Sequence, residues 1–342
     1  MKFFATLICA LAALTPIALS AEDTPEQPMF NIPKIDKHSI DANVEAWGNT
    51  GFRVDLLPDP NGNLRPASEF DAKFRLAWND DGLLLLVTVK KPQITEAEQP
   101  EDIWSKDSFE VFMGQQLGAE EYTQVMISPG CDPEHSEART YFNPRLKSPI
   151  PASELSVAVA RKAVNGGYVA EVMLPWKNLK MKPKLGDSAA FNIFVNAFDA
   201  RYRPPLMNGI WFPIADTSRN SKSMYTLKLA SESSPPMGFT ATAVCERFSR
   251  IHVQASAGDF ADGKSLTVSA GGKTLGQARM KVSDGRAVAD VMLPLPEPGA
   301  ASSPLDIALD GQKLKTIAMP DVDGLRAREF AKEKIQFVNG GR

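Results

Sequence analysis

Short alternating segments separated by turn residues are the feature of this sequence that most constrains its fold. Within residues 73–78, the apolar side chains Phe74, Leu76 and Trp78 recur at every second position, which is typical of a half-buried strand. The Asn-Asp-Asp-Gly sequence at 79–82 is a turn signal, and an apolar run follows it, so we predict a hairpin. Similar segments lie at 107–113, 121–127, 155–160, 168–174, 191–198 and 224–229. Because helical periodicity is weak, we predict an all-β fold, an antiparallel two-sheet β-sandwich of the jelly-roll or immunoglobulin-like type.

A small, polar segment at 231–236 (Ser-Glu-Ser-Ser-Pro-Pro) divides the sequence into two regions. All five tryptophans precede it. The region beyond it has strand signals of its own, followed by a helical pattern at 325–335. We therefore predict a β-sandwich over residues 31–230 and a smaller immunoglobulin-like β domain with a C-terminal helix over 237–342.

Residues 1–20 have the three parts of a secretory signal peptide. Lys2 gives a basic start, an apolar run covers 3–14, and small residues lie near the expected cleavage point at Ser20. The apolar run is shorter than the roughly 20 residues that a membrane-spanning helix needs. No later segment is apolar enough to cross a bilayer. We expect a secreted or periplasmic protein without a membrane span after signal cleavage.

Net charge and cysteine content narrow the range of partners. The net charge of −3 argues against a nucleic-acid partner, which a basic stripe would indicate. Two cysteines, Cys131 and Cys245, remain after signal cleavage. In an oxidising compartment they can pair. Because they fall in different predicted domains, two separate thiols are the alternative.

A series of motifs follows the order found in family 9 carbohydrate-binding modules. The strongest is Trp-Ser-Lys-Asp-Ser-Phe-Glu-Val-Phe at 104–112, which resembles that family's Trp-x-x-Asp-Ser-Val-Glu-Val-Phe. Residues 40–47 are similar to its Ile-Asp-Gly opening, with Ala42 in place of the glycine. Residues 168–176 are similar to a later strand of the family that ends in Pro-Trp. Further similar segments are residues 74–83, residues 191–199 and Trp211. The resemblance implies a carbohydrate-binding sandwich of the DOMON-like superfamily over residues 31–230.

The predicted strand at 104–112 carries candidate sugar-binding side chains. In an extended conformation Trp104 and Glu110 share one face, while Phe109 points to the other. An aromatic ring packs on the C–H groups of a sugar, and a carboxylate accepts hydrogen bonds from its hydroxyls. The resemblance implies that Trp104 and Trp211 clamp a sugar or the end of a glycan chain, with Glu110 as the polar arm. Asn196 is a further candidate for contact with a hydroxyl.

Each of these candidates also has a structural interpretation. Trp104 can cap the edge of the core, Glu110 can pair with a surface lysine, and Asn196 can make a strand-end hydrogen bond. Arg139 and Asn143 belong to a strand that can neighbour the clamp, and their spacing does not decide their role. The remaining tryptophans are predicted to lie in the core: Trp47, Trp78 and Trp176.

The sequence gives no sign of a catalytic centre. Its three histidines are scattered, and neither a His-Glu-x-x-His motif nor a Gly-x-Ser-x-Gly elbow occurs. Asp107 and Glu110 are an odd number of positions apart on a strand, so they face opposite sides. They therefore cannot be the facing carboxylate pair of a glycosidase. We predict a non-catalytic carbohydrate-binding protein.

Two other functions and one metal stay open. The superfamily that the chain resembles includes electron-transfer domains that bind haem b. Met126 is a candidate ligand for haem, but methionine also fills cores, and no Cys-x-x-Cys-His motif is present. The other alternative is a structural or partner-binding envelope protein. No cofactor is assigned, but structural calcium is left open. Its candidate oxygen donors are Asp36, Asp41 and residues 79–81, and turn formation alone also accounts for the last three.

Overall fold

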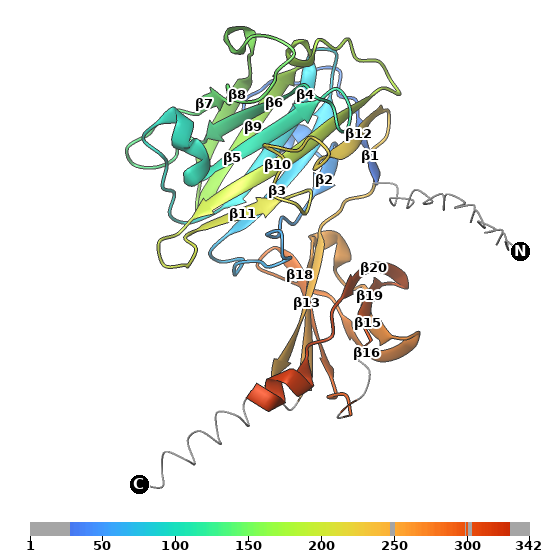
Figure 1. Ribbon diagram of the computed structural model, residues 1–342. Helices are drawn as coiled ribbons and strands as arrows, with labels where there is room; N and C mark the ends of the chain where they lie inside the picture. Colours follow the sequence, from blue (N-terminus) through green and yellow to red (C-terminus); the bar gives the residue numbers. More distant parts are fainter. Residues whose placement is uncertain (1–27, 247–249, 298, 300–302, 329–342) are drawn as a thin grey trace, which may run out of the picture.

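The computed structural model describes residues 28–246, 250–297, 299 and 303–328. The predicted signal peptide lies outside these residues, as does most of the predicted C-terminal helix, of which residues 322–328 are helical. The described chain forms a larger β-sandwich and a smaller β domain, which Figure 1 shows in blue to yellow and in orange to red. No helix in the described ranges is long and apolar enough to cross a membrane.

One layer of the larger sandwich is a seven-stranded sheet. Its strands run in the order β1-β12-β10-β5-β6-β7, and β11 also pairs with β10. The pairs are antiparallel, except that β1 and β12 are parallel. The strands are β1 (Met29–Pro33), β5 (Ser108–Gly114), β6 (Tyr122–Ser128), β7 (Arg139–Phe142), β10 (Ser188–Phe198), β11 (Leu206–Ile210) and β12 (Tyr225–Ala230).

The other layer is a five-stranded antiparallel sheet in the order β2-β3-β4-β9-β8. The predicted hairpin is formed by β3 and β4. Its turn is closed by Asn79, whose side-chain oxygen accepts hydrogen bonds from the backbone N–H groups of Asp81 and Gly82. The strands are β2 (Phe52–Val54), β3 (Asp71–Trp78), β4 (Gly82–Lys90), β8 (Ala158–Val164) and β9 (Gly167–Pro175).

The main core lies between these two sheets. Alternate residues of β4, such as Leu83 and Leu85, meet Phe109 and Val111 of β5 there. This confirms both the two-sheet sandwich and the face assigned to Phe109. The three tryptophans predicted to be core residues are also buried, Trp78 and Trp176 in this cluster and Trp47 in a smaller one.

The smaller cluster forms where an N-terminal segment covers the outer face of the five-stranded sheet. Glu171 of β9 lies on that face and is fully buried. Its carboxylate accepts hydrogen bonds from Trp47 Nε1 at 2.6 Å and from the backbone N–H groups of Asp41 and Ala42 at 2.9 and 2.8 Å. The His38 ring also contacts it. Ala42 has a φ of 57°, a left-handed conformation that favours glycine, which accounts for the glycine at this point of the related motif.

The smaller domain contains two four-stranded sheets around its own core. One sheet runs β13-β14-β18-β17 and the other runs β16-β15-β19-β20. The strands are β13 (Phe239–Glu246), β14 (Arg250–Ala257), β15 (Ser265–Ala270), β16 (Lys273–Arg279), β17 (Lys281–Ser283), β18 (Arg286–Leu293), β19 (Leu305–Leu309) and β20 (Gln312–Ile317).

A buried arginine joins the two β bodies. Arg286 of β18 donates to the Asp71 carboxylate at 2.8 Å and to the backbone oxygens of Arg65 and Phe70 at 2.8 and 2.6 Å. Thr240 adds a hydrogen bond to the Gly62 carbonyl at 2.7 Å. The smaller domain therefore packs directly against the start of β3 and the loop before it.

The two cysteines form no disulfide. Cys131 packs against the core of the larger sandwich, and Cys245 packs against the core of the smaller domain. The sequence left open a disulfide or two separate thiols, and the structure has two separate thiols.

We expect Glu171→Ala to lower the free energy of unfolding by about 3–5 kcal/mol, because it leaves several buried donors without an acceptor. Urea denaturation measures this change. Glu154→Ala, at an exposed position, is the control and should change stability by less than about 0.5 kcal/mol. Equal effects of the two substitutions would contradict the anchoring role of Glu171.

Candidate functional site

The outer face of the seven-stranded sheet brings the predicted polar residues together. On β5, Ser108 and Glu110 point away from the core that Phe109 and Val111 enter. Strand register places Asn208 of β11, Asn196 of β10 and Ser108 in one row across the sheet. The adjacent row carries Ile210, Phe194, Glu110, Met126 and Tyr141.

Glu110 is the centre of a network of side-chain amides. Its carboxylate accepts hydrogen bonds from Asn196 Nδ2 at 2.9 Å and from Gln124 Nε2 at 2.5 Å. Each of these amides is oriented by a second one. Asn208 donates to Asn196 Oδ1 at 2.6 Å, and Asn143 donates to Gln124 Oε1 at 2.7 Å. The network therefore directs donors from the two strands beside β5, β10 and β6, toward one carboxylate.

Burial changes the ionisation of Glu110. Its side chain is almost completely removed from water, which raises the pKa of the carboxyl to about 7, while the hydrogen bonds from Asn196 and Gln124 act in the opposite direction. The group therefore changes charge close to neutral pH. The expected pairing with a surface lysine is not found, since the hydrogen-bond partners of Glu110 are the two amides. The alternative of a strand-end hydrogen bond does not describe Asn196, because its amide donates to the side chains of Ser108 and Glu110 on this face.

Trp104 lies at the end of this face and is 48% exposed. It belongs to a 3-10 helix, η2 (Pro100–Ser105), that contacts β5, β6, β7 and β10. The ring therefore has the accessibility that a stacking residue needs. The extended conformation predicted for 104–107 is wrong, because the strand begins only at Ser108. The position of Trp104 is thus set by η2 and not by strand alternation.

Trp211 does not form the second wall of a clamp. It is only 5% exposed, and its ring packs among aromatic residues of the core. Pairing of β11 with β10 points Asn208 and Ile210 outward, so that Trp211, the next residue, points inward. The expected role of Trp211 in a clamp is therefore wrong. The surrounding rings belong to Phe30, Phe52, Phe74, Phe191 and Tyr225.

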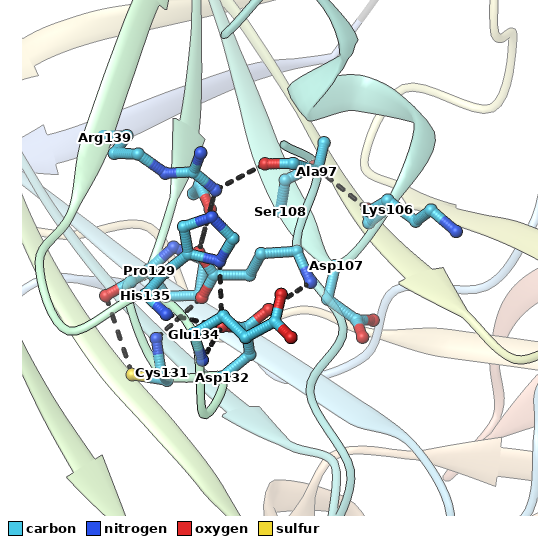
Figure 2. Close-up of polar contacts among 12 residues, drawn as sticks. Ala97, Lys106, Asp107, Ser108, Pro129, Cys131, Asp132, Glu134, His135 and Arg139 are labelled. Carbon is cyan, nitrogen blue, oxygen red and sulfur yellow. Dashed lines mark hydrogen bonds and ion pairs between the residues drawn. The ribbon is translucent and has the colours of Figure 1, made fainter. Parts of the chain in front are cut away.

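The loop that carries Trp104 is fastened on both sides. Arg139 of β7 donates to the backbone oxygens of Ala97 and Glu98 at 2.6 and 3.2 Å, and Figure 2 shows its guanidinium directed at Ala97. After the loop, Asp107 accepts backbone hydrogen bonds from Thr95 and Phe198 at 2.7 and 2.9 Å. Burial raises the pKa of Asp107 to about 6, against the opposing charge of Lys91. Arg139 therefore has a positioning role that its spacing in the sequence did not reveal.

Three members of the network were missed in the sequence: Ser108, Gln124 and Asn208. Gln124 interrupts a mostly apolar alternating segment, and Asn208 lies two positions before Ile210 on the same outward face. Polar residues in the outward phase of a strand are the signal that indicates them. Met126, the candidate haem ligand, lies beside Glu110 on this face and is buried.

The candidate calcium ligands have other contacts. Asp36 and Asp80 both pair with Lys34, and the backbone N–H of Asp41 bonds to Glu171. Within the described ranges there is no group of three or more His, Cys, Asp or Glu side chains that could hold a metal ion.

Glu110 should make stability depend on pH. Because its folded-state pKa is raised, its contribution to stability is present below about pH 4.5 and is lost as the pH rises through about 7. Glu110→Gln removes this titration. We expect the free energy of unfolding of the variant, relative to the unsubstituted protein, to rise by about 3 kcal/mol between acidic and mildly alkaline pH. Chemical denaturation over a pH series measures it, and parallel pH curves for the two proteins would contradict the burial of this carboxyl.

Comparison with known proteins agrees with the resemblance in the sequence. Endo-1,4-beta-xylanase A of Thermotoga neapolitana is 24% identical over 157 residues, and that of Thermotoga maritima is 26% identical over 157 residues. Each match covers 46% of this chain and 14% of the xylanase, so the chain spans only a small part of those relatives.

Similar solved structures include a family 9 carbohydrate-binding module from Caldicellulosiruptor kristjanssonii in complex with cellotriose. It is 18% identical, with a TM-score of 0.45 over 60% of this chain and 96% of the module. A module from the same organism in complex with glucose has a TM-score of 0.44 at 18% identity, over 61% of this chain and 98% of that one.

The family model described as carbohydrate family 9 binding domain-like matches residues 40–230. This range is more than half of the chain and includes both sheets of the larger sandwich almost completely. The protein therefore belongs to the carbohydrate family 9 binding domain-like family.

Proposed function

We propose that the outer face of the seven-stranded sheet binds a glycan, with Trp104 and Glu110 as its principal contacts. The observation that carries this proposal is the combination of an exposed indole and a buried carboxylate held by side-chain amides. Membership of a family of carbohydrate-binding domains supports it. Because Trp211 is buried, the ring of Trp104 acts as a single stacking surface and not as half of a clamp.

Each group on this face has a role in the proposed interaction. The ring of Trp104 packs against the C–H groups of a sugar, and Glu110, which is 6% exposed and already holds two amides, accepts further hydrogen bonds from its hydroxyls. Asn196 and Asn208 supply further amide groups along the same row. Because the amides are already fixed by one another, little side-chain entropy is lost when a ligand binds.

We further propose that this interaction is binding without catalysis. Glycoside hydrolysis uses two carboxyl groups that flank the bond to be cleaved. The hydrogen-bond partners of Glu110 are neutral amides, and Asp107 is engaged by Lys91 and two backbone N–H groups. This arrangement favours a recognition surface over a hydrolytic centre.

Trp104→Ala should weaken glycan binding about tenfold or more, because stacking on a ring contributes about 0.5–1.5 kcal/mol beyond the area it buries. Calorimetric titration with cellotriose and glucose, followed by a panel of soluble polysaccharides, measures it. The thermal midpoint should stay nearly unchanged, since the ring is exposed. Trp211→Ala is the matched control and should lower stability by about 3–5 kcal/mol. Unaltered affinity of a folded Trp104→Ala protein would place the site elsewhere.

We also propose that the protein is exported, which the pattern of residues 1–20 supports. In a bacterial host, the mature protein should be found outside the cytoplasm and should begin shortly after Ser20. N-terminal sequencing of fractionated material tests this. Recovery of the intact N-terminus in the cytoplasm would refute export.

A further inference from the structure

A shallow recess of about 690 Å³ lies at one end of the five-stranded sheet, apart from the proposed glycan face. It forms where β8 begins, where β9 ends, and where the turn between β3 and β4 approaches a short 3-10 helix, η4 (Trp176–Leu179). Its apolar lining comes mainly from Val157, Met173, Trp176 and Met181.

Lysines are concentrated beside this recess. Lys177, Lys180, Lys182 and Lys184 fall within eight residues, with no acidic residue between them, in a protein whose net charge is −3. All four are exposed, and Lys177 and Lys182 line the recess directly. None of them forms a salt bridge with another residue of the described ranges. The local charge is therefore available to an anionic partner.

The remaining polar lining indicates which anionic partner fits. Asp80, Asp81 and Ser156 also line the recess, and Asp80 is paired with Lys34 at 2.9 Å. A carboxylate repels a uniformly anionic surface such as a lipid bilayer, but it accepts hydrogen bonds from hydroxyl groups. A flat bilayer also makes poor contact with a concave surface. A polymer that carries both carboxylates and hydroxyls satisfies the lysines and Asp81 together, and its C–H groups can pack on the apolar lining.

We propose that this recess, with its four lysines, is a second binding site that takes an acidic polysaccharide of the uronate type. The lysine ammonium groups pair with the uronate carboxylates. The hydroxyls of the polymer bond to Asp81 and Ser156, and Met181 and Val157 contact its sugar rings. The site does not depend on Trp104 or Glu110, so its failure would leave the proposed function of the outer face unaffected.

Binding to polygalacturonate at low ionic strength tests the proposal, with fully methyl-esterified polygalacturonate as the uncharged probe. We expect binding to the acid and not to the ester. Replacing Lys177, Lys180 and Lys182 with glutamine should weaken binding to the acid about tenfold or more. The control triple variant changes Lys37, Lys273 and Lys281, which are exposed and remote in sequence, to glutamine and so alters net charge equally. It should bind almost as well as the unsubstituted protein.

Two further variants distinguish binding in the recess from binding at the outer face and from attraction by net charge alone. Met181→Glu keeps the four lysines but places a charge at the recess wall, so it should also weaken binding, with folding verified by its thermal midpoint. Trp104→Ala should leave binding to polygalacturonate unchanged. Equal losses in both triple variants, equal binding of acid and ester, or binding to phosphatidylglycerol vesicles without binding to polygalacturonate would each overturn the proposal. A loss in Trp104→Ala would mean that the acid binds at the outer face instead.

Discussion

A carboxylate that is removed from water must be given hydrogen-bond donors, and this requirement organises the larger sandwich. Glu171 takes its donors from the N-terminal segment, which it fixes over the five-stranded sheet. Asp107 takes them from Thr95, before the loop bearing Trp104, and from Phe198 at the end of β10. Asp71 receives Arg286 and so ties the smaller domain to the larger. In each case a buried charge connects parts of the chain that are distant in sequence, because breaking such a contact leaves an uncompensated group.

Glu110 follows the same requirement with a different result. Its donors are side-chain amides of neighbouring strands on the outer face of the sheet, so Glu110 does not hold a distant loop in place. Burial raises the pKa of Glu110 to about 7 against the hydrogen bonds of neutral amides, whereas burial raises the pKa of Asp107 to about 6 against the charge of Lys91. The fold thus holds one carboxyl in a fixed orientation at the outer face. Polar groups that are fixed before binding lose little side-chain entropy when a ligand with many hydroxyls binds.

The sequence predicted the features that depend on local alternation. The β3–β4 hairpin, the inward face of β5 and the burial of Trp78 follow from a period of two within single segments. The direction of Trp211 did not follow, because it depends on how β11 pairs with β10. The conformation at Trp104 depends on contacts of η2 with four strands, and those contacts are not visible in residues 104–107 themselves.

The amide network could not be predicted from local sequence patterns either. Asn196 and Glu110 are 86 positions apart, and only the register between β10 and β5 makes them neighbours. The Arg286 contact with Asp71 spans 215 positions for the same reason. Alternation within β5 placed Glu110 correctly on the outer face, and motif resemblance suggested its role as a polar contact. The resemblance misplaced Trp211, because a matching residue type does not determine which way its side chain points.

Glycan binding at Trp104 should leave the buried tryptophans undisturbed. The five indole N–H signals in a heteronuclear NMR titration with a binding glycan, beginning with cellotriose, test this most directly. We expect a large, saturable shift of the Trp104 signal, with the signals of Trp47, Trp78, Trp176 and Trp211 nearly unmoved. Saturable binding that leaves Trp104 unshifted, or that shifts Trp211 most, would contradict it.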